Sequence, residues 1–185
     1  VFLAAVMAFS LAACGEEPED ASSTTVNGGI SQPETEAPEY NLLTGQDLAE
    51  GMAPGQRPVA VMVNNSQAGM PQRGLGSADA VFEMVTEGGI TRLMAMYADA
   101  NTIPQVGPVR SARDQHLQFA LPLNAIFVHI GSSVYAQNLL NEYKYQDVDG
   151  LYLGETAFFF DGERAKSYLQ EFCWYTDANL IAAGI

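Results

Sequence analysis

Apolar and polar positions alternate in blocks along most of the chain, and the blocks predict strands. The run RPVAVMVNN is apolar and β-branched, which predicts a buried strand over residues 58–63. The stretch AVFEMVTEGGITRLMAMYA holds two strand-like runs around Gly88-Gly89, which accept the positive φ angles of a tight turn. We therefore predict a hairpin there, followed by strands at AIFVHI and TAFFF.

Helical patterns separate and follow these strands. The run SARDQHLQFAL predicts a helix that Ser111 caps and Pro122 ends, with Asp114 completing a capping-box pattern. A second helix is expected over SVYAQNLLNEYK, and Thr176 can cap a final one. Hairpins mixed with strand-to-helix units predict an α/β fold, a mixed sheet with helices packed on at least one face.

The first 40 residues do not fit this pattern. Residues 1–14, VFLAAVMAFSLAAC, are apolar and end in small residues, which is typical of a signal peptide and too short to span a bilayer. The motif LAAC resembles the lipobox of bacterial lipoproteins, which implies that Cys14 carries acyl chains and anchors the protein. Residues 15–40 contain seven acidic and no basic residues, so we expect a disordered acidic linker rich in Ser, Thr and Pro.

Charge and cysteine content narrow the classes of protein. The net charge is −14, and outside the linker 15 acidic residues face 8 basic ones, so nucleic acid is excluded as a partner. With Cys14 lipidated, only Cys173 remains, and no disulfide can form within the chain. We expect one α/β domain over residues 41–185, and we expect it to continue beyond Ile185 because TDANLIAAGI is an unfinished apolar pattern.

Several motifs together point to a family. LLTG, RPVAVMVNN, EGGITR, GPVRSARD and NAIFVHIGSS cover most of residues 42–133. In this combination they resemble the YerB-like bacterial lipoproteins, whose main domain is a domain of unknown function. The resemblance implies a lipid-anchored protein on the extracytoplasmic face of the cell membrane, with a layered α/β sandwich as its amino-terminal domain and a smaller carboxy-terminal domain. It implies no reaction, so function has to be argued from the residues.

Two arginines at an expected helix start are the first candidates. Arg110 and Arg113 lie three apart in VGPVRSARDQH, near a helix end whose dipole disfavours cations. Either Asp114 is the counter-ion of Arg113, or the two guanidinium groups bind a carboxylate or phosphate.

A second strand-to-helix junction offers similar chemistry. Ser132 and Ser133 follow a buried strand, where α/β sheets tend to bind ligands, although either serine could simply cap the helix. His129 belongs to the same edge, as a ligand contact or as a core residue. In the hairpin, a two-residue loop places Glu83, Glu87 and Arg92 on one face, as a structural ion-pair network or as the floor of a pocket.

The sequence therefore favours a binding protein over an enzyme. We expect a membrane-anchored cell-envelope lipoprotein that binds an anionic cell-wall component or an envelope protein, without a cofactor or a metal site. The fragment DVDG lacks the later ligands of a calcium loop and is interpreted as a turn. One alternative is an envelope hydrolase or transferase that uses Glu83, Glu87 and His129, and another is a scaffold with no small-molecule site. The expected ligand contacts and their supporting shell are Arg110, Arg113, Ser132, Ser133 and His129, supported by Arg92, Glu87 and Glu83.

Overall fold

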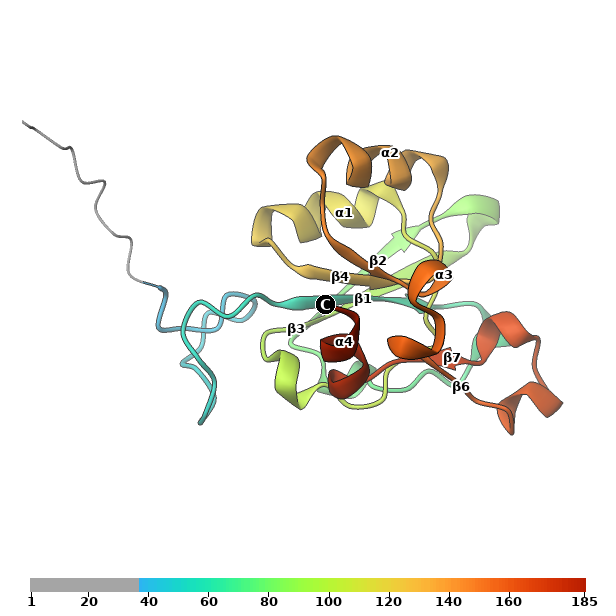
Figure 1. Cartoon of the computed structure of the whole chain (residues 1–185), viewed down its shortest axis with the longest axis horizontal. Coiled ribbons are helices and arrows are strands. Elements are labelled where there is room, and N and C mark those ends of the chain that lie inside the picture. Colours follow the sequence, from blue (N-terminus) through green and yellow to red (C-terminus); the bar gives the residue numbers. More distant parts are fainter. Residues whose placement is uncertain (1–36) are drawn as a thin grey trace, which may run out of the picture. The chain divides into compact units, whose positions relative to one another are not determined.

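A computed structural model describes residues 37–185 of the chain (Figure 1). The expected signal peptide, Cys14 and nearly all of the acidic linker lie outside these residues. Among the described residues, no helix is both long and apolar enough to cross a membrane.

A five-stranded mixed sheet forms the centre of the domain, with strand order β2-β3-β1-β4-β5. Strand β1 is antiparallel to β3 and parallel to β4, and β4 is parallel to β5. All six residues of β1 are buried because both faces of the sheet are covered. The strand bounds are Val59–Asn64 (β1), Ala80–Val85 (β2), Thr91–Tyr97 (β3), Ile126–His129 (β4) and Asp147–Asp149 (β5).

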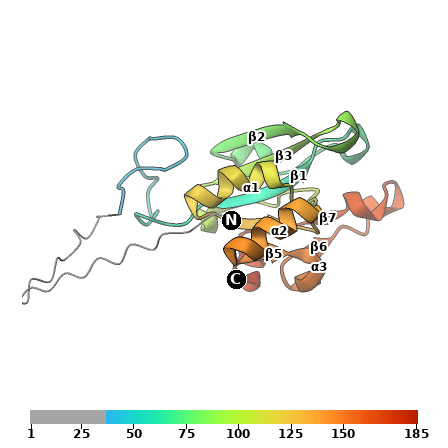
Figure 2. The same ribbon diagram turned by 90° about the horizontal axis from the view of Figure 1, so that it is seen from above.

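Helices cover both faces of the sheet and make a layered α/β sandwich, as predicted. Helices α1 (Asp114–Ala120) and α2 (Val134–Tyr143) lie side by side on one face (Figures 1 and 2). The other face packs against α4 (Ala178–Gly184) and a segment that holds α3 (Gly150–Leu153) and the β6-β7 hairpin. Strands β6 (Phe159–Phe160) and β7 (Trp174–Tyr175) form this second, two-stranded sheet. Short 3-10 turns occupy Gln67–Gly69, Leu75–Ser77, Glu87–Gly89, Ala100–Thr102, Leu121–Leu123, Gly154–Thr156, Arg164–Lys166 and Gln170–Phe172.

An extended segment, residues 108–112, lies between β1 and β4 at their carboxyl ends. The two strands pair directly with each other as far as Val61 and Val128. Beyond this point Arg110 N–H donates to the Met62 carbonyl at 2.9 Å, and Ile130 N–H donates to the Arg110 carbonyl at 3.2 Å. We call residues 108–112 the inserted segment, because its backbone satisfies the strand ends where they no longer pair with each other.

The inserted segment explains why α1 begins later than predicted. Ala112 N–H donates to the Gly131 carbonyl at 2.8 Å, so the backbone there is extended and cannot be helical. Helix α1 begins at Asp114, and Arg113 occupies the N-cap position without a side-chain cap. The prediction that Ser111 caps this helix is therefore wrong, and a 3-10 turn containing Pro122 follows α1 at its carboxyl end.

The hairpin is confirmed, but its predicted register is wrong by one residue. Three loop residues, Glu87–Gly89, separate the strands, and Thr86 N–H donates to the Ile90 carbonyl at 2.7 Å. Arg92 consequently faces Met84, whereas Glu83 faces Leu93. Because directly opposite residues share a face, Glu83 and Arg92 lie on opposite faces of the sheet.

The remaining elements follow the predictions with small shifts. Helix α2 is confirmed, and the Ser133 hydroxyl caps it by accepting from Ala136 N–H at 3.1 Å. The last helix is capped by Asp177, while the neighbouring Thr176 hydroxyl donates to the Ala157 carbonyl. The interpretation of DVDG as a turn is wrong, since Asp147–Asp149 form strand β5.

A glycine positions the start of the inserted segment, and this can be tested. Gly107 has φ 147°, and a Cβ there would meet the Trp174 carbonyl oxygen and Val109 N at 2.9 Å. We predict that Gly107→Ala lowers the free energy of unfolding by about 1–3 kcal/mol, measured by chemical denaturation. Gly162→Ala is the matched control, because no atom lies within 4 Å of its added Cβ. Equal stability of the two variants would show that the backbone at Gly107 is not constrained.

Candidate functional site

Polar buried residues line the edge of the sheet where the parallel strands end. Asn64, His129 and Asp149 are the last residues of β1, β4 and β5, and Arg92 lies opposite Asn64 at the same edge. The strand registers put all four on the face that α1 and α2 cover, and all four are buried. Open α/β sheets bind ligands at this edge, which makes it the candidate site of the domain.

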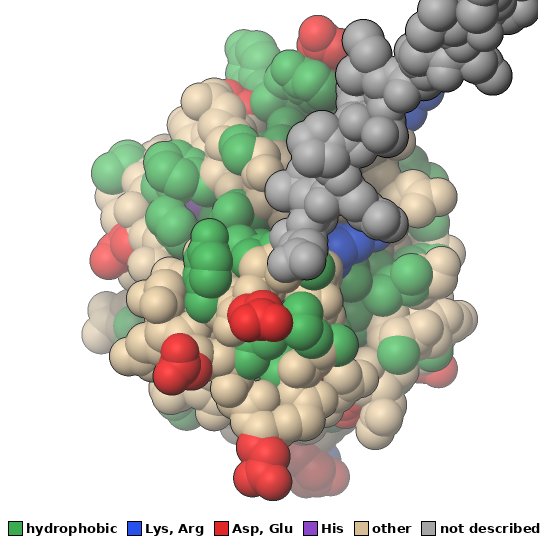
Figure 3. All heavy atoms as spheres, turned by 90° about the vertical axis from the view of Figure 1, so that its left-hand side faces the viewer, with side chains coloured by type: hydrophobic (Ala, Val, Ile, Leu, Met, Phe, Trp, Pro, Cys, Tyr) green, Lys and Arg blue, Asp and Glu red, His purple; other side chains and the backbone are tan. Residues whose placement is uncertain are grey.

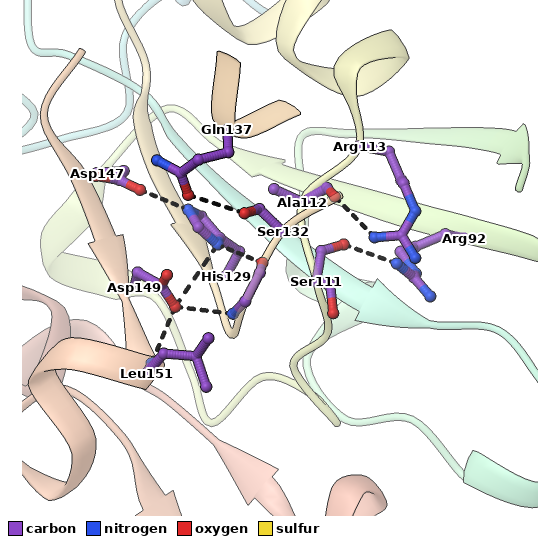
Figure 4. A network of polar contacts seen from close by, with 11 residues as sticks. Arg92, Ser111, Ala112, Arg113, His129, Ser132, Gln137, Asp147, Asp149 and Leu151 are labelled. Atoms are coloured by element: carbon purple, nitrogen blue, oxygen red, sulfur yellow. Dashed lines mark hydrogen bonds and ion pairs between the residues drawn. The ribbon is translucent and has the colours of Figure 1, made fainter. Parts of the chain in front are cut away.

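His129 lies between two carboxylates of β5 (Figure 4). Its Nε2 is 2.7 Å from Asp147 Oδ2, and its Nδ1 is 2.8 Å from the Gly131 carbonyl oxygen. Asp149 Oδ1 lies 3.8 Å from Nδ1 and accepts hydrogen bonds from the N–H groups of Gly131 and Leu151. We call His129, Asp147 and Asp149 the histidine cluster.

A backbone partner of the imidazole fixes the position of one ring proton. The Gly131 carbonyl can only accept a hydrogen bond, so Nδ1 of His129 carries a hydrogen. Nε2 faces Asp147 Oδ2 within hydrogen-bond distance, at 2.7 Å. His129 is therefore a buried residue with both ring nitrogens in polar contacts.

Arg92 is buried at the same edge without a carboxylate partner. Its guanidinium donates to the Ser111 carbonyl at 2.8 Å, and no ion pair includes it among residues 37–185. The pKa of Arg92 is lowered to about 10, mainly by burial and also by the positive charges of Arg113 and Arg110. The negative charge of Glu87 opposes this effect.

Arg113 is paired with the tip of the hairpin. Its Nε donates to both carboxylate oxygens of Glu87, at 2.7 and 3.0 Å, and the hydrogen bond lowers the pKa of Glu87. The Arg113 side chain is 15% exposed and that of Glu87 is 65% exposed. The structure thus corrects the assignment of Asp114 as the counter-ion of Arg113.

Arg110 has a different partner from Arg113. It donates to Glu171 Oε2 at 2.9 Å and stacks its guanidinium 5.3 Å from the centre of the Phe172 ring. The two arginines therefore have different counter-ions within the domain. With Arg92 they form an arginine cluster, whose members lie close enough to change the pKa of Arg92.

A cavity of about 370 Å³ lies beside Arg113 and brings it together with one of the predicted serines. Ser133 lines this cavity, whereas the Ser132 hydroxyl donates to Gln137 at 2.9 Å. The hairpin end, the start of α1 and the start of α2 form its walls through Val85, Thr86, Glu87, Arg113, Asp114, Gln115, Ser133 and Tyr135.

Comparison with known proteins places this geometry in a family. The model of the "Protein of unknown function (DUF3048) N-terminal domain" matches residues 43–184. The chain belongs to this family. The strand edge, the inserted segment and both clusters all lie within the matched DUF3048 domain.

Two comparisons with Bacillus subtilis YerB agree with this membership. YerB of strain 168, which is named as a lipoprotein, is 40% identical over 116 residues that cover 62% of this chain and 33% of YerB. The YerB crystal structure matches with a TM-score of 0.67 and 34% identity over 76% of this chain and 46% of that chain. The chain thus spans between a third and a half of the length of YerB, and the expected YerB-like α/β fold and lipoprotein family are confirmed.

The residues of the alternative hydrolase do not come together in this DUF3048 domain. Glu83 is exposed and accepts hydrogen bonds from Thr91 at 2.6 Å and Asn65 at 2.9 Å. Glu87 binds Arg113, and His129 binds Asp147. Within residues 37–185 no hydrogen bond or ion pair joins any two of Glu83, Glu87 and His129.

Asp147 and Asp149 are not among the site residues predicted from the sequence. Their spacing places both on one face of a strand, and this signal was present in DVDG. Their contact with His129 comes from the parallel pairing of β4 with β5, with His129 opposite Asp149. Sequence alone did not indicate that these two strands are neighbours.

A buried histidine next to the arginine cluster predicts a pH dependence of stability. His116 contacts the Arg92 carbonyl through Nε2 at 3.2 Å, and its buried Nδ1 has no hydrogen-bond partner among residues 37–185. Burial lowers the pKa of His116 below 6.5, and the charges of Arg92 and Arg113 add to the effect. The unfolded chain therefore takes up this proton first as the pH falls.

We predict that the free energy of unfolding decreases as the pH falls below about 6.5, with a slope of at most about 1.4 kcal/mol per pH unit from this one proton. His116→Gln should make the decrease shallower, as measured by chemical denaturation at pH 7.5 and 5.5. An unchanged slope in the variant would contradict a neutral His116 in the folded state.

Proposed function

We propose that this DUF3048 domain, held at the extracytoplasmic face of the membrane by lipidated Cys14, binds the anionic group of an envelope component through Arg113 and Arg92. The group is a carboxylate or a phosphate, both of which fit a planar guanidinium. The names of the family and of its relative YerB state neither a ligand nor a reaction, so the ligand is argued from the structure.

The main support for this proposal is the charge balance of the arginine cluster. Its three guanidinium groups are paired with only two carboxylates, Glu87 and Glu171, among the described residues. Arg92 is the member left without a carboxylate, and it is only 3% exposed. A buried charge without a counter-ion is costly, so an incoming anion that shares Arg92 and Arg113 is stabilised there.

Glu87 occupies the place that such an anion would take on Arg113. It lies at the tip of the hairpin, largely exposed, and is followed by Gly88 and Gly89, which both have positive φ. An exposed ion pair contributes about 1 kcal/mol or less. A ligand carboxylate or phosphate can therefore displace Glu87 from Arg113 at small cost, and the glycines let the hairpin tip move away.

The neighbouring cavity offers contacts for the rest of a ligand. The Ser133 hydroxyl accepts from Ala136 N–H and still has its own hydrogen to donate. Tyr135 is 70% exposed on the cavity wall and presents an aromatic surface to an apolar or sugar group.

The domain has a net negative charge, so anion binding needs a local cluster of positive side chains. The space-filling view shows carboxylates scattered over an otherwise apolar and neutral face, with little basic surface (Figure 3). An acidic surface repels anions at long range. Binding therefore depends on the few arginines at the edge of the sheet and not on a general electrostatic attraction.

The first test measures anion binding to the full chain by calorimetry, with inorganic phosphate and N-acetyl-D-alanine as probes. We predict that Arg113→Gln weakens binding of the preferred probe about 10–100-fold, the value of a charged hydrogen bond of about 1.5–3 kcal/mol. Glu87→Gln should strengthen binding severalfold, because the competing carboxylate loses its charge. A change in folding would weaken binding in both variants. Opposite effects of the two variants on the affinity for one probe therefore indicate a binding site.

Lys166→Gln is the matched control, since it also removes one positive charge from an exposed ion pair, the Lys166–Glu163 pair at 2.6 Å. Its affinity should stay within twofold of the unmodified chain. The proposal fails if neither probe binds the unmodified chain, or if Arg113→Gln and Lys166→Gln bind alike. A loss of stability in Arg113→Gln without any anion binding would instead support the scaffold alternative.

A further inference from the structure

The histidine cluster brings together three potential metal ligands from two adjacent strands. One ligand atom each from His129, Asp147 and Asp149 lies within 4.8 Å of the other two. His129 and Asp149 are buried, whereas the Asp147 side chain is 26% exposed. The cluster is thus closed on the side of the sheet and accessible through Asp147.

The residues around the cluster hold the ligands in a suitable orientation. Nδ1 of His129 donates to the Gly131 carbonyl, which leaves Nε2 as the ring atom for a metal, the usual arrangement of metal-binding histidines. Asp149 receives the N–H groups of Gly131 and Leu151 on Oδ1 alone, which leaves Oδ2 available. Two of the three ligands are therefore fixed by bonds to backbone groups.

The two carboxylates of the cluster have no basic side chain as a partner other than the imidazole. No Lys or Arg within residues 37–185 forms an ion pair with Asp147 or Asp149. A divalent ion would offset the negative charge of the two carboxylates, which favours its binding in a site of low solvent exposure.

We infer that His129, Asp147 and Asp149 bind a divalent transition metal ion. One imidazole nitrogen and two carboxylate oxygens suit Zn²⁺ or Mn²⁺, whereas Mg²⁺ and Ca²⁺ prefer sites made of oxygen atoms only. Three protein ligands leave at least one coordination position for water or for a group of a ligand.

Asp147 has to move slightly away from His129 Nε2 when a metal ion binds. Metal–ligand bonds of about 2.0–2.2 Å place neighbouring ligand atoms about 3 Å apart, whereas Nε2 and Asp147 Oδ2 are 2.7 Å apart. The Asp147 carboxylate bonds only to His129 among the described residues and is partly exposed, so it can move by the few tenths of an ångström needed. This inference does not depend on the proposed anion site, which uses other residues.

The test is calorimetric titration of the full, chelator-treated chain with MnCl₂, whose ion does not favour thiolates. We expect one saturable Mn²⁺ site and at least tenfold weaker binding of Mg²⁺. Asp147→Asn should weaken Mn²⁺ binding tenfold or more, because it removes a charged ligand. Asp47→Asn is the matched control, an exposed position outside the cluster where the same charge is lost without effect.

A second measurement needs no variant. The chain has two histidines, His116 and His129, so the ring ¹⁵N resonances give an internal comparison during titration with ZnCl₂. We expect a large shift of Nε2 of His129 and none of the His116 ring. The inference is overturned if Mn²⁺ shows no saturable site, if Asp147→Asn and Asp47→Asn bind equally, or if the His129 ring does not respond.

Discussion

The hydrogen bonds of the inserted segment are the interaction on which the edge of this domain depends. Strands β1 and β4 are parallel neighbours, yet beyond Val61 and Val128 the segment takes over their backbone groups. It closes the crevice in which open α/β sheets usually admit a ligand. In doing so it divides the edge: Arg92 on β3 lies on the β1 side of the segment, the histidine cluster lies on its β4 side, and Arg110 belongs to the segment itself.

The arginine cluster and the histidine cluster lie at the same edge of the sheet and have unbalanced charges of opposite sign. Among the described residues, the arginine cluster has one more guanidinium group than it has carboxylate partners, whereas the histidine cluster has two carboxylates and no Lys or Arg partner. Both imbalances lie in or beside buried residues, where charge is expensive. A fold held together by the apolar cores on the two sheet faces can carry such local costs.

The sequence predicts those elements whose signals lie within a few neighbouring residues. Its predictions fail where contacts with residues distant in the sequence determine the structure. The buried strand predicted over residues 58–63 is observed at Val59–Asn64, and helix α2 is confirmed; both follow from periodicity, and α2 also from its cap. Ser111 has the chemistry of a cap, but hydrogen bonds of the adjacent residues to β1 and β4 keep its backbone extended. The Gly88-Gly89 pair indicated a turn without revealing that Glu87 also belongs to the loop, so the predicted charge cluster of Glu83 and Arg92 is absent. The pairing of His129 with Asp149 depends on strand order, which local patterns do not contain.

One peptide group belongs to both halves of the edge. The Gly131 carbonyl accepts from His129 Nδ1 at 2.8 Å and from Ala112 N–H of the inserted segment at 2.8 Å. Two donors on one oxygen polarise it jointly, so the strength of each bond depends on the other. The strand end that holds His129 and the backbone that precedes Arg113 are therefore tied together through one shared acceptor, so neither can shift without disturbing the bond that holds the other.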